Sequence, residues 1–242
     1  MRKKMPSWMN VSMNNGKRLK SFLMGFAPSK YSSFIFMLFF LGGFLYAFLD
    51  PVRAQSTFYG GFFLNELTAQ IFPPSEFSFQ YLLNQFVFFL GKTSWGIFFN
   101  NLMVSLECIF SGFLIIPIIL IDLFGFLGSV FYLLIMKWGI VKGVFLFAGS
   151  FHLIFEVLAA ILVIDAFISF YGTIINSVRK KSLKTFTGGV LNKFVPLMLR
   201  IIILLFIAAL LEVFWSTWWV YILTHPYIPW IDFYIGVYSC VY

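Results

Sequence analysis

The chain has 242 residues, of which 61% are hydrophobic and only 11% charged. Soluble domains carry about 25% charged residues, so this composition excludes an ordinary soluble protein. The net charge of +8 does not indicate nucleic-acid binding, because most lysines and arginines lie in two blocks outside the apolar segments, as in the cytoplasmic loops of membrane proteins.

Apolar segments dominate the chain between these basic blocks. A helix needs about 20 predominantly apolar residues to cross the hydrocarbon core of a bilayer. The sequence therefore predicts an all-α fold, a polytopic transmembrane helical bundle of about five spans, within a domain covering residues 32–223. The predicted spans are residues 33–49, 97–121, 122–136, 144–171 and 195–223. Since the third is short, a re-entrant hairpin formed by the second and third is an open alternative.

Two segments outside the spans are predicted to lie on the outer side. Asp50-Pro51 ends the first span, because proline cannot continue the helical hydrogen-bond ladder. Residues 50–96 mix apolar and polar positions at helical spacing, and we expect interfacial amphipathic helices there rather than a span. Residues 224–242 form an aromatic tail.

The basic residues predict the orientation of the chain. The N-terminal segment, residues 1–31, and a polar loop, residues 172–194 with Gly188-Gly189 as its turn, hold most of the 17 lysines and arginines. The positive-inside rule places both in the cytoplasm, so the C-terminus is extracytoplasmic. The basic residues left on the outer side are Arg53, Lys92, Lys137 and Lys142.

Basic residues at the cytoplasmic surface are also candidates for contacts with lipid headgroups. Anionic lipids attract such residues, and an arginine one turn inside a span can extend its side chain to the headgroups. The expected headgroup contacts are Lys17, Arg18, Lys20, Arg179, Lys180, Lys181, Lys184 and Arg200.

Polar side chains recur within the apolar segments. His152 and Glu156 are four residues apart and share one helix face, and two further pairs on other spans have the same spacing. Ionisable groups are costly in a bilayer, so these side chains indicate either hydrogen bonds between helices or a path for protons, ions or a small solute. The predicted polar core comprises Asn100, Asn101, Glu107, Ser111, His152, Glu156, Glu212 and Ser216. Asp165 lies roughly opposite Glu156 by helical angle, so we expect a different contact for it.

No constellation in the sequence predicts catalysis or a cofactor. A zinc site needs three or four protein ligands, and the second histidine, His225, lies in the aromatic tail. We therefore expect no catalytic residue, no cofactor and no metal.

Three short motifs follow one another at the polar positions. They are Phe98-Phe99-Asn100-Asn101 with Ser111-Gly112 and Pro117 after it, His152-Leu153-Ile154-Phe155-Glu156 with Ala159-Ala160, and Ala208-Ala209-Leu210-Leu211-Glu212 with Ser216-Thr217. In this order, and with the five-span layout, they resemble the stage II sporulation protein M family of integral membrane proteins. Leu153 stands where glycine is usual in that family, and Phe151 where proline often precedes the histidine.

The resemblance implies a membrane component rather than an enzyme. Members in spore formers act with partner proteins that remodel the cell wall, a role that does not transfer to this chain. We expect a non-enzymatic assembly partner or scaffold subunit in the cytoplasmic membrane, in contact with the bilayer and with other membrane proteins or further copies of itself. A transporter or channel subunit with a polar core is the alternative.

Overall fold

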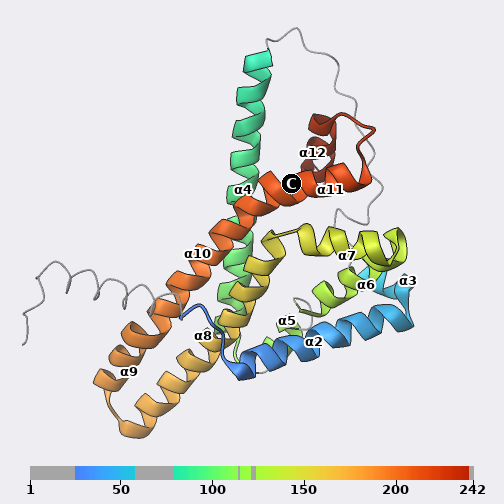
Figure 1. Ribbon diagram of the computed structural model, residues 1–242. Coiled ribbons are helices and arrows are strands. Elements are labelled where there is room, and N and C mark those ends of the chain that lie inside the picture. The colour runs from blue at the N-terminus through green and yellow to red at the C-terminus, as the bar shows by residue number, and fades with distance from the viewer. Residues whose placement is uncertain (1–24, 58–78, 114, 121–123, 240–242) are drawn as a thin grey trace, which may run out of the picture.

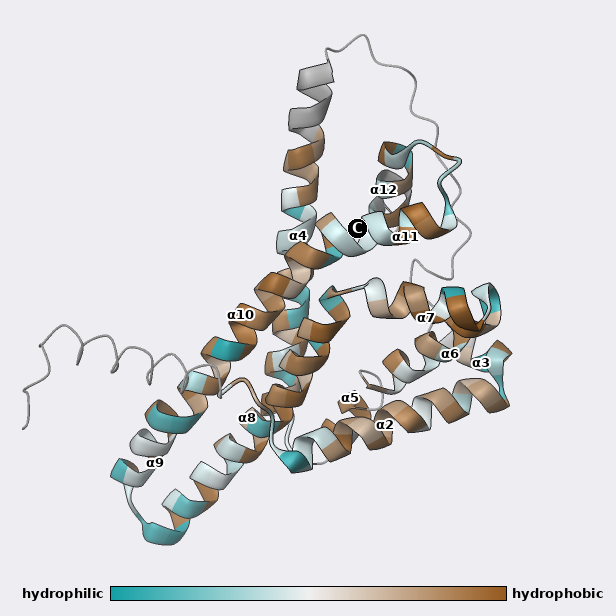
Figure 2. Ribbon diagram, viewed as in Figure 1, coloured by the Kyte–Doolittle hydropathy of each residue, from teal (hydrophilic) through white to brown (hydrophobic). Residues whose placement is uncertain are grey.

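A computed structural model describes residues 25–57, 79–113, 115–120 and 124–239. These residues are helical, with no strand among them, which confirms the all-α prediction. Within the described ranges, three helices are long and apolar enough to cross a membrane: Lys30–Leu49, His152–Lys180 and the continuous helix Leu183–Thr224. Figure 2 shows their apolar character, which is compatible with a membrane location. The prediction of five spans is therefore not confirmed, since three helices of the described ranges meet this criterion.

The helices follow one another with short connections (Figure 1). Their bounds are α2 Lys30–Leu49, α3 Pro51–Thr57, α4 Phe79–Phe110, α5 Ile116–Leu120, α6 Phe126–Trp138, α7 Ile140–Gly149, α8 His152–Lys180, α9 Leu183–Gly189, the π-helical turn η2 Val190–Phe194, α10 Val195–Leu211, the π-helical turn η3 Glu212–Ser216, α11 Thr217–Thr224 and α12 Trp230–Ser239.

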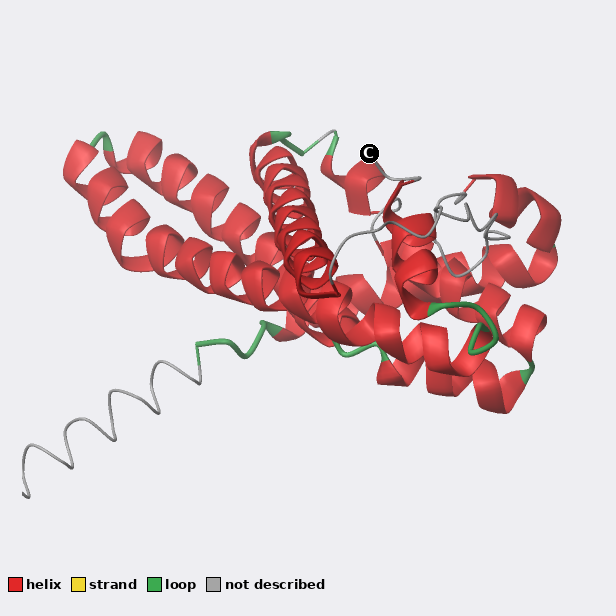
Figure 3. Cartoon of the chain, turned by 90° about the horizontal axis from the view of Figure 1, so that it is seen from above, coloured by secondary structure: helices red, strands yellow, loops and turns green. Residues whose placement is uncertain are grey.

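A long antiparallel hairpin is formed by α8 and the continuous helix α9–α11 (Figures 1 and 3). α8 ends at Lys180, and the residue that caps it, Lys181, has a left-handed φ of 49°. Ser182 caps α9 by accepting a hydrogen bond from the backbone N–H of Thr185. Pro196 has no N–H to donate, and the turn before it widens into η2, where the N–H of Val195 donates to Val190.

A second layer is formed by α2, α6 and α7, and it lies across the hairpin rather than parallel to it (Figure 1). α2 and α6 pack closely because small residues face each other: a Cβ on Gly43 would collide with the backbone of Gly125, and one on Gly128 with the carbonyl of Phe40. The hydroxyl of Ser129 donates to the carbonyl of Gly43 at 2.8 Å.

α4 packs against α8 and α10 of the hairpin, and α2 contacts α8 to join the second layer to it. The larger core lies where these helices meet and includes Cys108, Ile109, Leu162 and Leu205. A second core lies under α12, where Phe233 and Tyr238 are buried against α4, α6, α7 and α11. The polar residues described below lie near the crossing of α4, α8 and α10.

α4 is one helix of 32 residues that runs through residue 97, where a span was predicted to begin. The hydroxyls of Thr93 and Ser94 donate to the carbonyls of Phe89 and Leu90, so these polar side chains are satisfied within the helix. α4 ends before Gly112, at a φ of 83°, and the short α5 follows. The interfacial helices expected over residues 50–96 fall partly on residues 58–78, which lie outside the described residues.

Two further boundaries differ from prediction. The expected span 144–171 is interrupted at Ser150, which separates α7 from α8. The expected loop 172–194 is almost entirely helical, with its turn at Lys181 and Ser182 and not at Gly188-Gly189. Arginine and lysine are good helix formers, so the basic residues that indicated a loop extend both arms of the hairpin.

Candidate functional site

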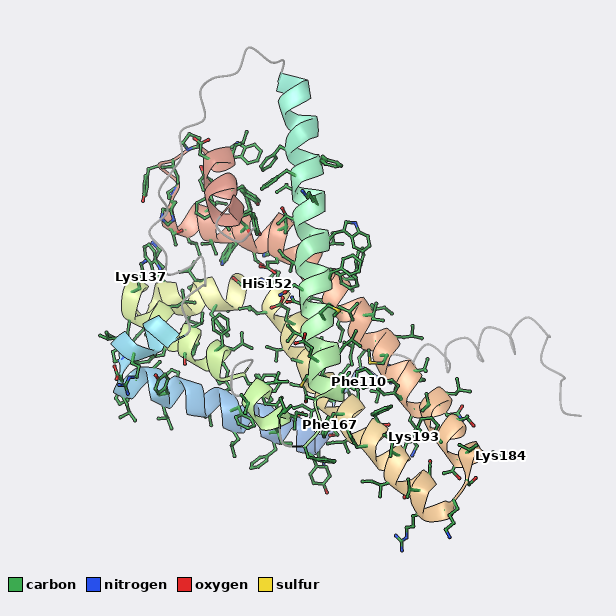
Figure 4. The ribbon with its side chains drawn as sticks, turned by 180° about the vertical axis from the view of Figure 1, so that it is seen from behind. Phe110, Lys137, His152, Phe167, Lys184 and Lys193 are labelled. Carbon is green, nitrogen blue, oxygen red and sulfur yellow. The ribbon has the colours of Figure 1, made fainter. Side chains whose placement is uncertain are left out.

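His152 begins α8 and is only 4% exposed. Its Nδ1 atom lies 2.6 Å from the hydroxyl of Ser216, a buried residue of η3. A buried imidazole requires a hydrogen-bond partner, and Ser216 supplies one across the hairpin. Figure 4 shows His152 near the point where the helices cross.

Glu156 lies one turn further along α8 and is half-buried. Its Oε1 atom accepts a hydrogen bond of 2.9 Å from the side-chain amide of Asn101 on α4. Together with the His152–Ser216 contact, this bond connects three separate helices through polar side chains. Such bonds between membrane helices contribute about 0.6 kcal/mol each on average.

Glu212 is the third member of this polar cluster, which we define as Asn101, His152, Glu156, Glu212 and Ser216. The residue is half-buried, and its carboxyl group is buried close to that of Glu156. The only ion pair among the described residues, Arg53 with Asp50, lies elsewhere. The two carboxyl groups therefore share a site without a basic partner from the described part of the chain.

The π-helical turn η3 positions two members of the cluster. It begins at Glu212 and ends at Ser216. The hydroxyl of Thr217 donates to the carbonyl of Glu212 at 2.8 Å, which satisfies a backbone acceptor where the helix widens. π-Helical turns occur often at functional sites, and here the turn presents Ser216 to His152.

The break between α7 and α8 lies beside the cluster. The indole N–H of Trp215 donates to the carbonyl of Gly149 at 2.9 Å, and that of Trp219 donates to the carbonyl of Phe145 at 3.0 Å. The carbonyl of Gly149 also accepts from the backbone N–H of Phe151 at 3.0 Å. The two indole groups thus bond the last turn of α7 to the neighbouring arm of the hairpin. Phe151 stacks on Trp215 with ring planes 3° apart.

Asp165 makes a separate polar contact on the other side of α8. Its two carboxylate oxygens accept from the backbone N–H of Ser29 at 2.9 Å and from the hydroxyl of Ser32 at 2.7 Å. A carboxylate at the N-terminus of a helix is favoured by the helix dipole. Asp165 thus fixes the start of α2 against α8.

Arg200 is half-buried and packs against Gly25, in the segment that leads into α2. Its Nε atom is buried and has no hydrogen-bond partner among the described residues. The structure therefore covers part of a side chain that the sequence predicted to reach the headgroups.

Three residues of the predicted polar core lie away from the cluster. Asn100 and Glu107 are exposed on the outer side of α4. Ser111 follows α4, and its hydroxyl donates to the carbonyl of Cys108 at 3.0 Å. A spacing of four residues placed Glu107 and Ser111 on one face, but it does not tell which face of α4 is covered.

The predicted headgroup contacts fall in two groups. Lys17, Arg18 and Lys20 lie outside the described residues. The rest of the set, apart from Arg200, is exposed at the end of the hairpin: Arg179, Lys180, Lys181 and Lys184.

His225 lies just beyond the end of α11 and was not part of the predicted site. Its Nδ1 atom lies 2.6 Å from the hydroxyl of Thr224. Burial lowers the pKa of His225 below 6.5, and the charges of Lys137 and Lys142 lower it further. Lys142 also lies over the ring of Trp138, at 4.4 Å from its centroid. No pattern in the sequence indicates that the end of α11 meets the turn between α6 and α7.

In the described ranges, no group of three or more histidine, cysteine, aspartate or glutamate side chains could hold a metal ion. Comparisons of the chain with protein-family models, with curated proteins and with solved structures found no match. The class defined by the fold is a helical protein with three described helices able to cross a membrane.

Proposed function

We propose that this chain is a non-enzymatic integral membrane protein that serves as an assembly partner or scaffold subunit of a complex in the cytoplasmic membrane. The main support for this proposal is the exposed outer face of α4, which contains two polar residues. Asn100 and Glu107 are both exposed there and lie seven residues apart, two turns along the same helix face.

The neighbours of these two residues are large and apolar. Met103, which lies between them on that face, is 55% exposed, and Phe110, three residues after Glu107, is 52% exposed. α4 packs along α8 and α10, which belong to helices long enough to span a membrane. A charged side chain facing lipid at the centre of a bilayer costs about 2.5–3.5 kcal/mol on insertion scales. A second helix with polar groups of its own would remove that cost by hydrogen bonding to Asn100 and Glu107.

The resemblance to the stage II sporulation protein M family supports the same proposal, since members of that family act together with partner proteins. The partner helix belongs to another membrane protein or to a second copy of this chain. Both alternatives place the contact on the outer face of α4.

The test is the size of the protein purified in mild detergent. We expect the wild-type protein to elute as a complex and the double variant Asn100→Leu/Glu107→Leu to elute as a monomer. Leu38→Ala/Leu45→Ala is the matched control, because these α2 residues are also seven apart and 53% and 55% exposed. A wild-type protein that elutes as a lone monomer would contradict the proposal.

A second candidate function is transport of protons or another small cation, and the polar cluster favours it. The carboxyl groups of Glu156 and Glu212 lie close together, near the break between α7 and α8. Two such carboxyl groups can hold one proton between them. Vesicles containing the purified protein would then show proton or cation flux that Glu156→Gln/Glu212→Gln abolishes. Absence of flux from wild-type vesicles would eliminate this candidate.

A further inference from the structure

The end of the α8–α9 hairpin gathers four basic side chains, which we call the basic tip: Arg179, Lys180, Lys181 and Lys184. All four are exposed. Figure 4 shows Lys184 at the end of the hairpin and Lys193 further along the same arm. The tip is an ordered turn, since Lys181 adopts a left-handed conformation and Ser182 caps α9.

No acidic residue of this region offsets the charge of the tip. The sequence contains no aspartate or glutamate between Asp165 and Glu212. The described residues include no ion pair at the tip. Its charge is therefore available to a negatively charged ligand.

Large apolar side chains are exposed among these basic residues. Leu183 is 83% exposed, Val178 71% and Ile175 58%. Basic residues next to exposed apolar ones are typical of segments that lie at the boundary between headgroups and acyl chains. A binding surface for a soluble acidic partner or a nucleic acid does not require Leu183 and Val178 to be exposed beside the lysines.

The length of the hairpin agrees with this position. α8 has 29 residues, so at 1.5 Å per residue it is about 43 Å long. The hydrocarbon core is about 30 Å thick. If α8 crosses the bilayer, one of its ends extends beyond the hydrocarbon, and the charged end is at Lys180.

From these observations we infer that the basic tip binds the phosphate groups of anionic phospholipids, in the leaflet that surrounds the C-terminal end of α8. Val178 and Leu183 then contact the acyl chains. This inference is independent of the assembly role proposed for α4. It assigns the charged hairpin to lipid and leaves Arg200, which packs against Gly25, outside the site.

The experiment measures lipid retained by the full chain. Protein reconstituted with equal amounts of phosphatidylglycerol and phosphatidylcholine is returned to mild detergent, and native mass spectrometry counts the lipids that stay bound. We expect the wild-type protein to retain phosphatidylglycerol preferentially. In Arg179→Gln/Lys180→Gln/Lys181→Gln/Lys184→Gln, the preference should fall about fivefold for each charge removed.

A charge-matched control uses the four basic residues predicted for the opposite side. Arg53→Gln/Lys92→Gln/Lys137→Gln/Lys142→Gln changes the net charge by the same amount and should keep the preference. Equal loss in the two variants, or no preference in the wild-type protein, would overturn the inference. Circular dichroism checks that both variants remain helical.

A third variant tests the apolar contact. Val178→Ser/Leu183→Ser keeps every charge, and both residues are exposed, so the fold should persist. We expect it to retain less phosphatidylglycerol than the wild-type protein. Unchanged retention would contradict the position of the tip at the acyl-chain boundary.

Discussion

Asp165 holds the start of α2 against α8 through both of its carboxylate oxygens. Replacing it with asparagine removes the charge and turns one acceptor into a donor that faces the N–H of Ser29 or the hydroxyl of Ser32. Hydrogen bonds to charged groups contribute about 1.5–3 kcal/mol. We therefore expect Asp165→Asn to lower the free energy of unfolding by about that amount, measured by thermal or denaturant unfolding in detergent.

Asp50→Asn is the control for this prediction. Asp50 pairs with Arg53 at 3.9 Å, and the two side chains are 48% and 75% exposed. Exposed ion pairs contribute about 0–1 kcal/mol, and asparagine caps a helix about as well as aspartate. An equal loss of unfolding free energy in the two variants would show that the contact of Asp165 with α2 contributes no more to stability than an exposed ion pair.

His225 makes stability depend on pH. Because burial and the nearby lysines lower its pKa in the folded protein, the unfolded chain takes up a proton more readily below pH 6.5. Stability contributed by the neutral imidazole is present above that pH and is lost as the pH falls below it. We expect the melting temperature in detergent to drop from pH 7 to pH 5, and His225→Gln to reduce that drop. An unchanged drop in the variant would exclude His225 as its source.

The contact between α2 and α6 depends on glycine at particular positions of the two helices. A Cβ on Gly43 would collide with the backbone of Gly125, whereas one on Gly42 would meet nothing within 4 Å. Overpacking of this kind costs about 1–3 kcal/mol. We expect Gly43→Ala to destabilise the protein by that amount.

Gly42→Ala is the neighbouring control, and it should be neutral or stabilising by up to about 1 kcal/mol, because alanine favours helix over glycine. Unfolding of both variants in the same detergent gives the comparison. Two equal melting temperatures would mean that the close approach of α2 and α6 is not needed for stability.

Sequence reasoning predicted the helical class and the proline that ends the first helix, since both follow from local patterns. α2 ends at Leu49 and α3 begins at Pro51. The break at Ser150 could not be predicted, because the indole groups that bond to the last turn of α7 come from Trp215 and Trp219, more than sixty residues away. Ser29 and Ser32, the partners of Asp165, lie 136 and 133 residues away in the sequence, so this contact could not be predicted either.

The predicted polar core shows the same limit within one helix. Asn100 and Asn101 are adjacent in the sequence, yet Asn101 bonds to Glu156 while Asn100 is exposed. Hydrophobic periodicity does not distinguish these two faces, because the polar residues of α4 are spread around the helix and not gathered on one side. Only the packing of α4 against α8 and α10 decides which asparagine points inward.

In the molecule as a whole, the continuous helix from Leu183 to Thr224 runs from the basic tip to the aromatic C-terminal segment. Its 42 residues extend about 63 Å at 1.5 Å per residue. From the positive-inside rule we expect the basic tip in the cytoplasm and the aromatic C-terminal segment outside. We expect a cysteine at Lys184 to react with an impermeant maleimide only from the cytoplasmic side, and one at Tyr227, which is 78% exposed, only from the outside. Labelling of both from the same side would refute this topology.

The proposed role in assembly rests on the outer face of α4. A photo-crosslinking amino acid at Met103, between Asn100 and Glu107 on that face, is compared in native membranes with one at Leu45 on α2; both side chains are 55% exposed. We expect position 103 to crosslink to another protein or to a second copy of the chain, whereas position 45 crosslinks chiefly to lipid. Crosslinks to lipid alone from both positions would contradict the proposed role in assembly.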